Sequence, residues 1–282
     1  MRGRALLGAL LALVLGAASA QFSGPSESRA PRAAEADAVI QAVCASRVPL
    51  GRLRGCRQGS YAGRLSPELR GPQVRLLFSS LLPGTFTAPG RRELLATFCT
   101  ETEGCAGETV LLRRVKGEWT AVELVRGALL PGACLTYPRP GGTQAAVCLD
   151  ESRAGEPLGR ALRILSWPAG KLRVQTAALF PLLGFRDFFG QGSEQCAGRW
   201  ELKPSSWDDR DRDADGQPDL TVRALRTIYR SRPDLCTAGQ GFYGDALAES
   251  SVRRDLTFVW TGESLRATGM TADTLRKYAG GR

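Results

Sequence analysis

Short apolar runs separated by turn residues fill the C-terminal three quarters of the chain, and this pattern restricts the fold more than any other feature. The run "TVLLRRV" turns at Lys116-Gly117 into "EWTAVELV", and "LTFVW" turns through Thr261-Gly262 into "SLRAT". Runs of this length, with turns about every eight to twelve residues, are typical of antiparallel sheets. We therefore expect residues 72–282 to form one mainly-β domain, an antiparallel meander with a propeller-like or sandwich arrangement.

Residues 1–20 have the features of an export signal. Arg2 and Arg4 precede an apolar run, and Ala18-Ser19-Ala20 forms a small-x-small cleavage site. No later apolar run has the length needed to span a bilayer. We expect the mature chain to begin near Gln21, to be secreted or periplasmic, and to contain no membrane span.

Two short segments separate this signal from the β domain. Residues 21–35 are polar, small and proline-containing, which favours a disordered leader. The stretch "AAEADAVIQAVCASRV" places apolar residues at helical spacing among good helix formers. Residues 36–71 are therefore expected to hold one short N-terminal helix followed by a loop.

The eight cysteines all lie after the signal, and their number is even. In an oxidising compartment this pattern predicts four disulfides. A zinc site is disfavoured because the chain has no Cys-x-x-Cys and no histidine. Turn segments between Cys134 and Cys148 and between Cys99 and Cys105 favour local pairing. If neighbours pair throughout, the expected pairs are Cys44–Cys56, Cys99–Cys105, Cys134–Cys148 and Cys196–Cys236.

The formal net charge of the whole chain is +10. Arginines supply most of the positive charge and are spread singly or in pairs, which favours a solvated basic surface. An anionic partner, such as an envelope polymer, an acidic polysaccharide or a membrane surface, is the alternative, and another protein is a further possible partner. The chain has no long basic block interleaved with aromatic residues, so we expect no nucleic-acid binding.

One acidic stretch, "DRDRDADGQPDL" at 209–220, interrupts this basic chain. Calcium takes six to eight oxygen ligands and tolerates irregular geometry. The spacing predicts a calcium loop with side-chain ligands at positions 1, 3, 5 and 9, a backbone carbonyl at position 7 and a turn at position 6; a solvated polar loop is the alternative. The residues in question are Asp211, Asp213, Asp215, Asp219, the carbonyl of Gln217 and the turn residue Gly216.

An EF-hand is disfavoured here because position 12, which needs a bidentate glutamate, is Val222. The string D-x-D-x-D-G-x-x-D-L-x-V at 211–222 instead resembles the calcium loops of FG-GAP/VCBS-type repeats, as in integrin-like β-propellers. That resemblance implies the ligand set above, a loop joining two strands of one blade, and a buried strand start at Leu220 and Val222. The sequence contains a single copy of this loop pattern.

The absence of histidine excludes Ser-His-Asp, Cys-His and the usual zinc-hydrolase arrangements. We therefore expect a non-catalytic, calcium-binding, disulfide-stapled β protein that acts as a binding or structural module of the cell envelope or extracellular space. The alternative is a carboxylate-dependent polysaccharide hydrolase. Its candidate acids are Glu118, Glu123 and Glu201, and its candidate sugar platforms are Trp119, Trp167, Trp200, Trp207 and Trp260, although each acid also fits an outward strand position and the tryptophans fit core positions.

Overall fold

The structure, a computed structural model, gives the fold of most of the region after the expected export signal. It describes residues 28–44, 76–100, 107–125, 134–151, 159–181, 199–230, 247–261 and 264–279. The expected signal at 1–20 lies outside the described residues, as do the four cysteines Cys56, Cys105, Cys196 and Cys236.

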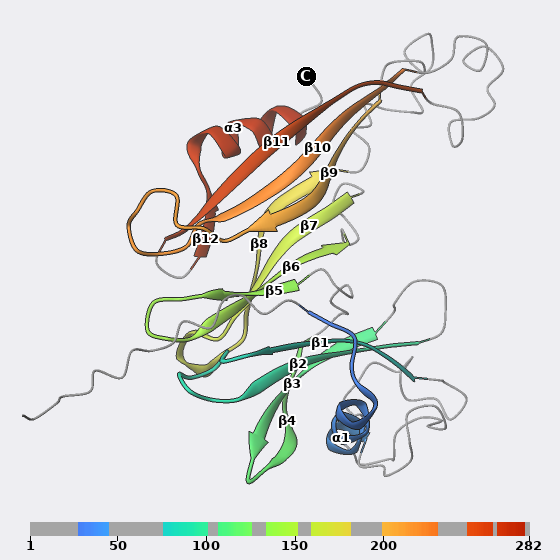
Figure 1. Ribbon diagram of the computed structural model, residues 1–282, viewed down its shortest axis with the longest axis vertical. Coiled ribbons are helices and arrows are strands. Elements are labelled where there is room, and N and C mark those ends of the chain that lie inside the picture. Colours follow the sequence, from blue (N-terminus) through green and yellow to red (C-terminus); the bar gives the residue numbers. More distant parts are fainter. Residues whose placement is uncertain are drawn as a thin grey trace, which may run out of the picture.

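The described strands form three four-stranded antiparallel sheets, and each sheet is built from strands consecutive in the chain. This arrangement confirms the predicted mainly-β meander (Figure 1). Sheet 1 contains β1 (Leu76–Gly84), β2 (Glu93–Thr100), β3 (Gly107–Val115) and β4 (Glu118–Val125). Sheet 2 contains β5 (Cys134–Pro138), β6 (Gln144–Glu151), β7 (Gly159–Ser166) and β8 (Arg173–Pro181). Sheet 3 contains β9 (Arg199–Asp208), β10 (Leu220–Arg230), β11 (Leu247–Thr261) and β12 (Ser264–Ala267).

The three sheets stack face to face, with sheet 2 in the middle (Figure 1). Along β7, Leu162 and Ile164 pack toward sheet 3, whereas Leu165 packs toward sheet 1. Because successive side chains of a strand point to opposite faces, a middle sheet needs apolar residues at nearly every position. The stretch "ALRILS" of β7 is apolar apart from Arg163 and Ser166, and the result is a layered, sandwich-like core.

The N-terminal helix α1 (Ala33–Cys44) covers the outer face of sheet 1 (Figure 1). Its buried residues Val39, Ile40 and Val43 pack in one apolar cluster with strand residues of that sheet. The predicted short N-terminal helix is therefore present, and it begins three residues before the expected boundary.

The chain just before α1, within the expected leader at 21–35, makes backbone hydrogen bonds to two sheets. The Ser28 N–H donates to the Cys134 carbonyl at 2.8 Å, and Arg29 exchanges backbone hydrogen bonds with Leu81. Residues 28 and 29 thus connect β5 of sheet 2 with β1 of sheet 1. These backbone bonds give a polar segment a fixed place that its composition does not indicate.

A second helix, α3 (Gly269–Ala279), lies against β8, β11 and β12 and was not predicted. Leu275 packs against the core between sheets 2 and 3, and the Thr271 hydroxyl accepts a hydrogen bond from the Thr257 N–H at 2.8 Å. Its large apolar residues are only Met270, Leu275 and Tyr278, so its helical periodicity is weak in the sequence. Among the described residues, no helix has both the length and the apolar character needed to cross a membrane.

The disulfide between Cys134 and Cys148 is confirmed, and it joins directly opposed residues of β5 and β6. Cys44 is also disulfide-bonded, and its partner is not among the side chains that the structure describes. The predicted pairs 44–56, 99–105 and 196–236 each include a cysteine outside the described residues, so they stay predictions.

Candidate metal site

The acidic loop, residues 209–219, connects β9 to β10 at one end of sheet 3. The strands are paired up to the loop, since Thr221 lies opposite Asp208 in the register. Leu220 and Val222 are fully buried immediately after the loop, as the sequence pattern implied. Both flanks are strands, so the loop has the strand–loop–strand context expected of it rather than the helical context of an EF-hand.

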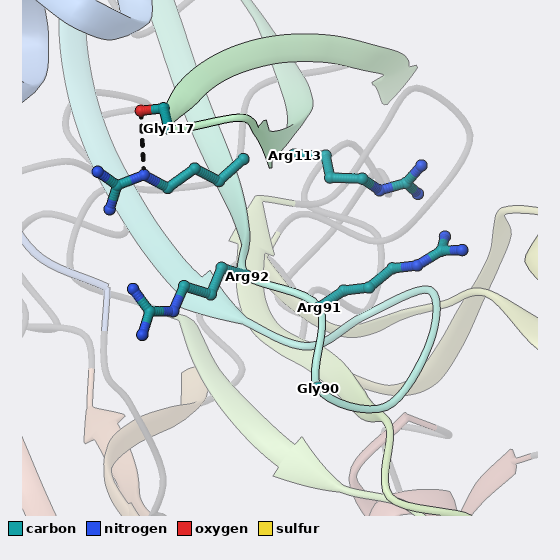
Figure 2. A pocket seen from close by; sticks show the side chains of 6 residues that line it. Gly90, Arg91, Arg92, Arg113 and Gly117 are labelled. Atoms are coloured by element: carbon teal, nitrogen blue, oxygen red, sulfur yellow. Dashed lines mark hydrogen bonds between the residues drawn. The ribbon is translucent and has the colours of Figure 1, made fainter.

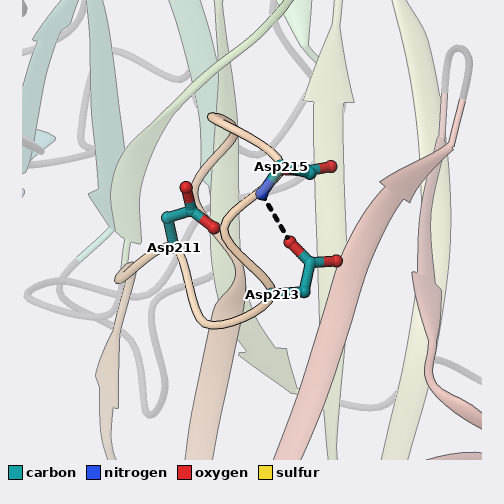
Figure 3. Close-up of side chains that lie close together, drawn as sticks. All are labelled: Asp211, Asp213 and Asp215. Carbon is teal, nitrogen blue, oxygen red and sulfur yellow. Dashed lines mark hydrogen bonds between the residues drawn. The ribbon is translucent and has the colours of Figure 1, made fainter.

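The structure brings Asp211, Asp213 and Asp215 together at the surface (Figure 3). One carboxylate oxygen from each lies within 4.8 Å of the others. Each side chain also accepts a backbone N–H of the same loop: Gly216 donates to Asp211 at 2.9 Å, Asp215 to Asp213 at 3.2 Å, and Gln217 to Asp215 at 2.7 Å. These bonds hold the carboxylates in place and leave the second oxygen of each free for a cation.

Two positive-φ residues let the loop turn back on itself. Ala214 has φ of 60° and Gly216 has φ of 82°. Glycine adopts this region without a steric penalty, which explains its presence at the predicted turn position. The turn directs the backbone N–H groups of residues 215–217 toward the carboxylates.

The fourth predicted side-chain ligand, Asp219, is buried, with 4% of its surface exposed. Its Oδ2 accepts the Arg212 N–H at 2.9 Å, and its own N–H donates to the Arg210 carbonyl at 3.1 Å. Asp219 therefore closes the base of the loop and lies outside the group formed by Asp211, Asp213 and Asp215. Gln217, expected to offer its carbonyl, contributes the N–H bond to Asp215.

The charges around the loop are unevenly compensated. Asp208 is paired with Arg212 at 3.1 Å and with Arg223 at 3.5 Å. Burial, more than the nearby Asp208 charge, raises the pKa of Asp209. The hydrogen bond from the Asp215 N–H lowers the pKa of Asp213, but desolvation and the neighbouring carboxylates outweigh it, so that this pKa is raised. A cation would remove this mutual repulsion.

Tyr137 of β5 anchors the loop to sheet 2, and sequence reasoning missed it. Its hydroxyl donates to the Pro218 carbonyl, and its ring stacks on Trp260 with centroids 5.7 Å apart. The residue is fully buried. Burial, together with the nearby acids led by Asp219, raises the pKa of Tyr137 above its ordinary value, so it stays a neutral donor. The contact links residues 81 positions apart, which no local pattern reveals.

Tyr137→Phe is expected to lower the free energy of unfolding by about 1–2 kcal/mol, because the Pro218 carbonyl loses its donor in a partly buried place. Chemical denaturation monitored by tryptophan fluorescence measures this change. Unfolding midpoints that coincide for the variant and the natural protein would show that Tyr137 does not hold the loop.

Most of the residues considered for a hydrolase have structural roles where the structure describes their side chains, and Glu118 is the exception. The Glu123 carboxylate accepts the indole N–H of Trp167 at 2.6 Å, and Trp167 is 2% exposed. Trp119, Trp207 and Trp260 are partly buried and pack against the apolar clusters. Glu118 is exposed, and the side chains of Trp200 and Glu201 lie outside the described set. The core interpretation of the described tryptophans is supported.

No family model, curated protein or solved structure matches the chain. The likeness of residues 211–222 to FG-GAP/VCBS-type calcium loops therefore rests on the residues of the loop themselves.

Proposed function

We propose that this protein is an exported, non-catalytic binding or structural module of the cell envelope or extracellular space, stapled by disulfides and by one calcium ion. The convergence of Asp211, Asp213 and Asp215 is the observation that carries the proposal. An all-β scaffold with bonded cysteines and a cation-ready loop suits a protein that must keep its shape in an oxidising, calcium-containing medium.

Calcium is the cation that suits this loop best. The donors are oxygens, which hard cations prefer, and the three gathered carboxylates are exposed, so water can complete the shell. Magnesium requires near-ideal octahedral geometry, which a short irregular loop satisfies less readily. The absence of histidine and of a cysteine in the group disfavours zinc. The FG-GAP/VCBS-type pattern points to the same ion.

The non-catalytic part of the proposal is supported by the same side chains that a hydrolase would need. The Glu123 carboxylate accepts a hydrogen bond from Trp167. The described tryptophans pack against apolar clusters and are not fully exposed, as sugar platforms would be. Catalysis by nucleophile and imidazole is excluded by composition. A rigid stack of sheets with exposed turns is well suited to presenting a binding surface.

Calcium is expected to raise the melting temperature of the natural protein. A loop without a bidentate glutamate should bind with a dissociation constant of about 10⁻⁴ to 10⁻³ M, in the range of extracellular modules. At ten times that constant, calcium should add about 1.4 kcal/mol to the free energy of unfolding. Differential scanning fluorimetry with calcium, magnesium or a chelator measures the shift.

Asp215→Asn should abolish the calcium-dependent shift, since it removes one charge but keeps an oxygen that can accept the Gln217 N–H. The matched control is Asp273→Asn, which removes one charge from an exposed ion pair on α3. Equal calcium responses in the two variants would mean that the acidic loop is a solvated turn.

A further inference from the structure

A second charged feature lies at the end of sheet 1, far along the chain from the acidic loop. A groove of about 590 Å³ is lined by Gly90, Arg91, Arg92, Arg113, Arg114 and Gly117, and we call it the arginine groove (Figure 2). It is formed by the connection between β1 and β2 and by the hairpin between β3 and β4. Four of its six lining residues are arginines.

The β2–β3 register brings these arginines together. Glu93 lies opposite Arg113, and the Arg114 N–H donates to the Arg92 carbonyl at 3.0 Å. The hairpin then closes at Lys116 and Gly117, whose φ values of 49° and 91° fit a tight two-residue turn. Two arginine pairs that are separated in the sequence thus become neighbours at one sheet end.

The positive charge of the groove is largely uncompensated. The Glu93 carboxylate is fully buried, pairs with Arg113 at 3.0 Å and accepts bonds from Thr87. Among the described residues, no carboxylate pairs with Arg91, Arg92 or Arg114, and all three are exposed. Arg91 donates to the Thr87 hydroxyl at 3.3 Å, and Arg114 uses Nε on the Gly117 carbonyl at 3.1 Å, which leaves its terminal nitrogens available.

The arginines extend to both sides of the sheet end. Figure 2 shows the side chains of Arg91 and Arg113 reaching to one side and that of Arg92 reaching to the other. A single small anion can meet the guanidinium groups on one side only. A chain that carries several anionic groups can pass over the end of the sheet and meet both.

We propose that the arginine groove binds an acidic polysaccharide through its repeated sulfate, phosphate or carboxylate groups. Planar guanidinium groups bind such oxyanions through paired N–H bonds. The lining holds no aromatic residue on which nucleic-acid bases could stack, and no apolar side chain of the kind found at the centre of protein interfaces. The inference names the partner class of the proposed binding module, and it does not depend on the calcium loop.

The test compares the natural protein with Arg92→Gln/Arg114→Gln in binding to immobilised dextran sulfate and polygalacturonate at about 0.15 M salt. Both side chains are exposed, so the fold should persist, and the melting temperature checks this. The control is Arg276→Gln/Lys277→Gln, which also removes two positive charges, but from exposed positions on α3. We expect the groove variant to bind at least one polymer about tenfold more weakly or worse, since charge-assisted bonds are lost, and the control to bind like the natural protein.

Dextran sulfate carries sulfate groups and polygalacturonate carries carboxylates, so comparing them distinguishes recognition of the two groups. Groove-dependent binding of either polymer supports the proposal. If the groove variant and the control lost polymer binding equally, overall charge would explain the binding, and the proposal would be overturned. Tighter binding to polyglutamate or to single-stranded DNA, or binding to inorganic sulfate as tight as to the polymer, would also overturn it. Each binding measurement is repeated with a chelator. If the polymer still binds but calcium does not raise the melting temperature, the calcium site is contradicted and the polymer-binding proposal stands.

Discussion

Asp150→Ala is expected to lower the free energy of unfolding by about 3–5 kcal/mol. In sheet 2, the Arg163 Nε lies 3.0 Å from Asp150 Oδ2, and the two side chains are 4% and 10% exposed. Arg163 also donates to the Thr176 hydroxyl at 2.8 Å. Removal of the carboxylate takes one ion-pair partner from a buried guanidinium, whose desolvation is then less well compensated. Urea unfolding measures the loss.

Two comparisons isolate the buried charge as the cause. Asp273→Ala breaks the Asp273–Arg276 pair on α3, whose side chains are 72% and 76% exposed, and should cost at most about 1 kcal/mol. Asp150→Ala/Arg163→Met removes both buried charges and should be more stable than Asp150→Ala alone. A double variant no more stable than the single one would contradict the explanation.

Loss of the Cys134–Cys148 disulfide is expected to cost about 3 kcal/mol, the chain-entropy value for a loop of about 15 residues. The two cysteines are 14 positions apart in the sequence, and both are buried between sheets 1 and 2. The variant Cys134→Ala/Cys148→Ala leaves all other cysteines unchanged. Chemical denaturation under non-reducing conditions measures the effect, and an unfolding free energy equal to that of the natural protein would show that the bond adds nothing to the fold.

These two sites belong to one row that crosses all four strands of sheet 2. Cys134 lies opposite Cys148, Cys148 opposite Arg163, and Arg163 opposite Thr176. Neighbouring side chains in such a row share their packing, so their contributions should not add independently. The two cysteines of the row belong to the apolar cluster between sheets 1 and 2.

The strands were largely predictable because their signals are local. Each hairpin is marked by turn residues, as at Lys116-Gly117, and by flanking apolar runs. The Cys134–Cys148 pair followed from the same reasoning, since the turn between the two cysteines places them opposite each other. The helix at Ala33–Cys44 was predictable from its apolar spacing.

The order in which the sheets stack was not predictable, because it depends on contacts between distant segments. The apolar residues of β7 point to both faces, which fits a strand buried on both sides, but they do not reveal which sheets cover it. Helix α3 was not predicted because it buries few apolar residues. The arginine groove arises from the β2–β3 register, which joins arginines that look scattered in the sequence.

In the acidic loop, too, local features were predictable and contacts with distant residues were not. The spacing and the glycine at position 6 predicted the approach of Asp211, Asp213 and Asp215, because all of these constraints lie within one short segment. The spacing did not reveal that Asp219 bonds the Arg212 N–H at the base of the loop. Nor did it reveal Tyr137, which reaches Pro218 from another sheet.

Isothermal titration of the natural protein with calcium tests the central claim most directly. We predict one calcium ion per chain, with a dissociation constant of about 10⁻⁴ to 10⁻³ M. Asp213→Asn/Asp215→Asn should remove that binding, whereas Asp255→Asn/Asp273→Asn, which removes two charges from exposed ion pairs, should preserve it. Absence of calcium binding by the natural protein, or an unchanged titration of the loop variant, would contradict the calcium site.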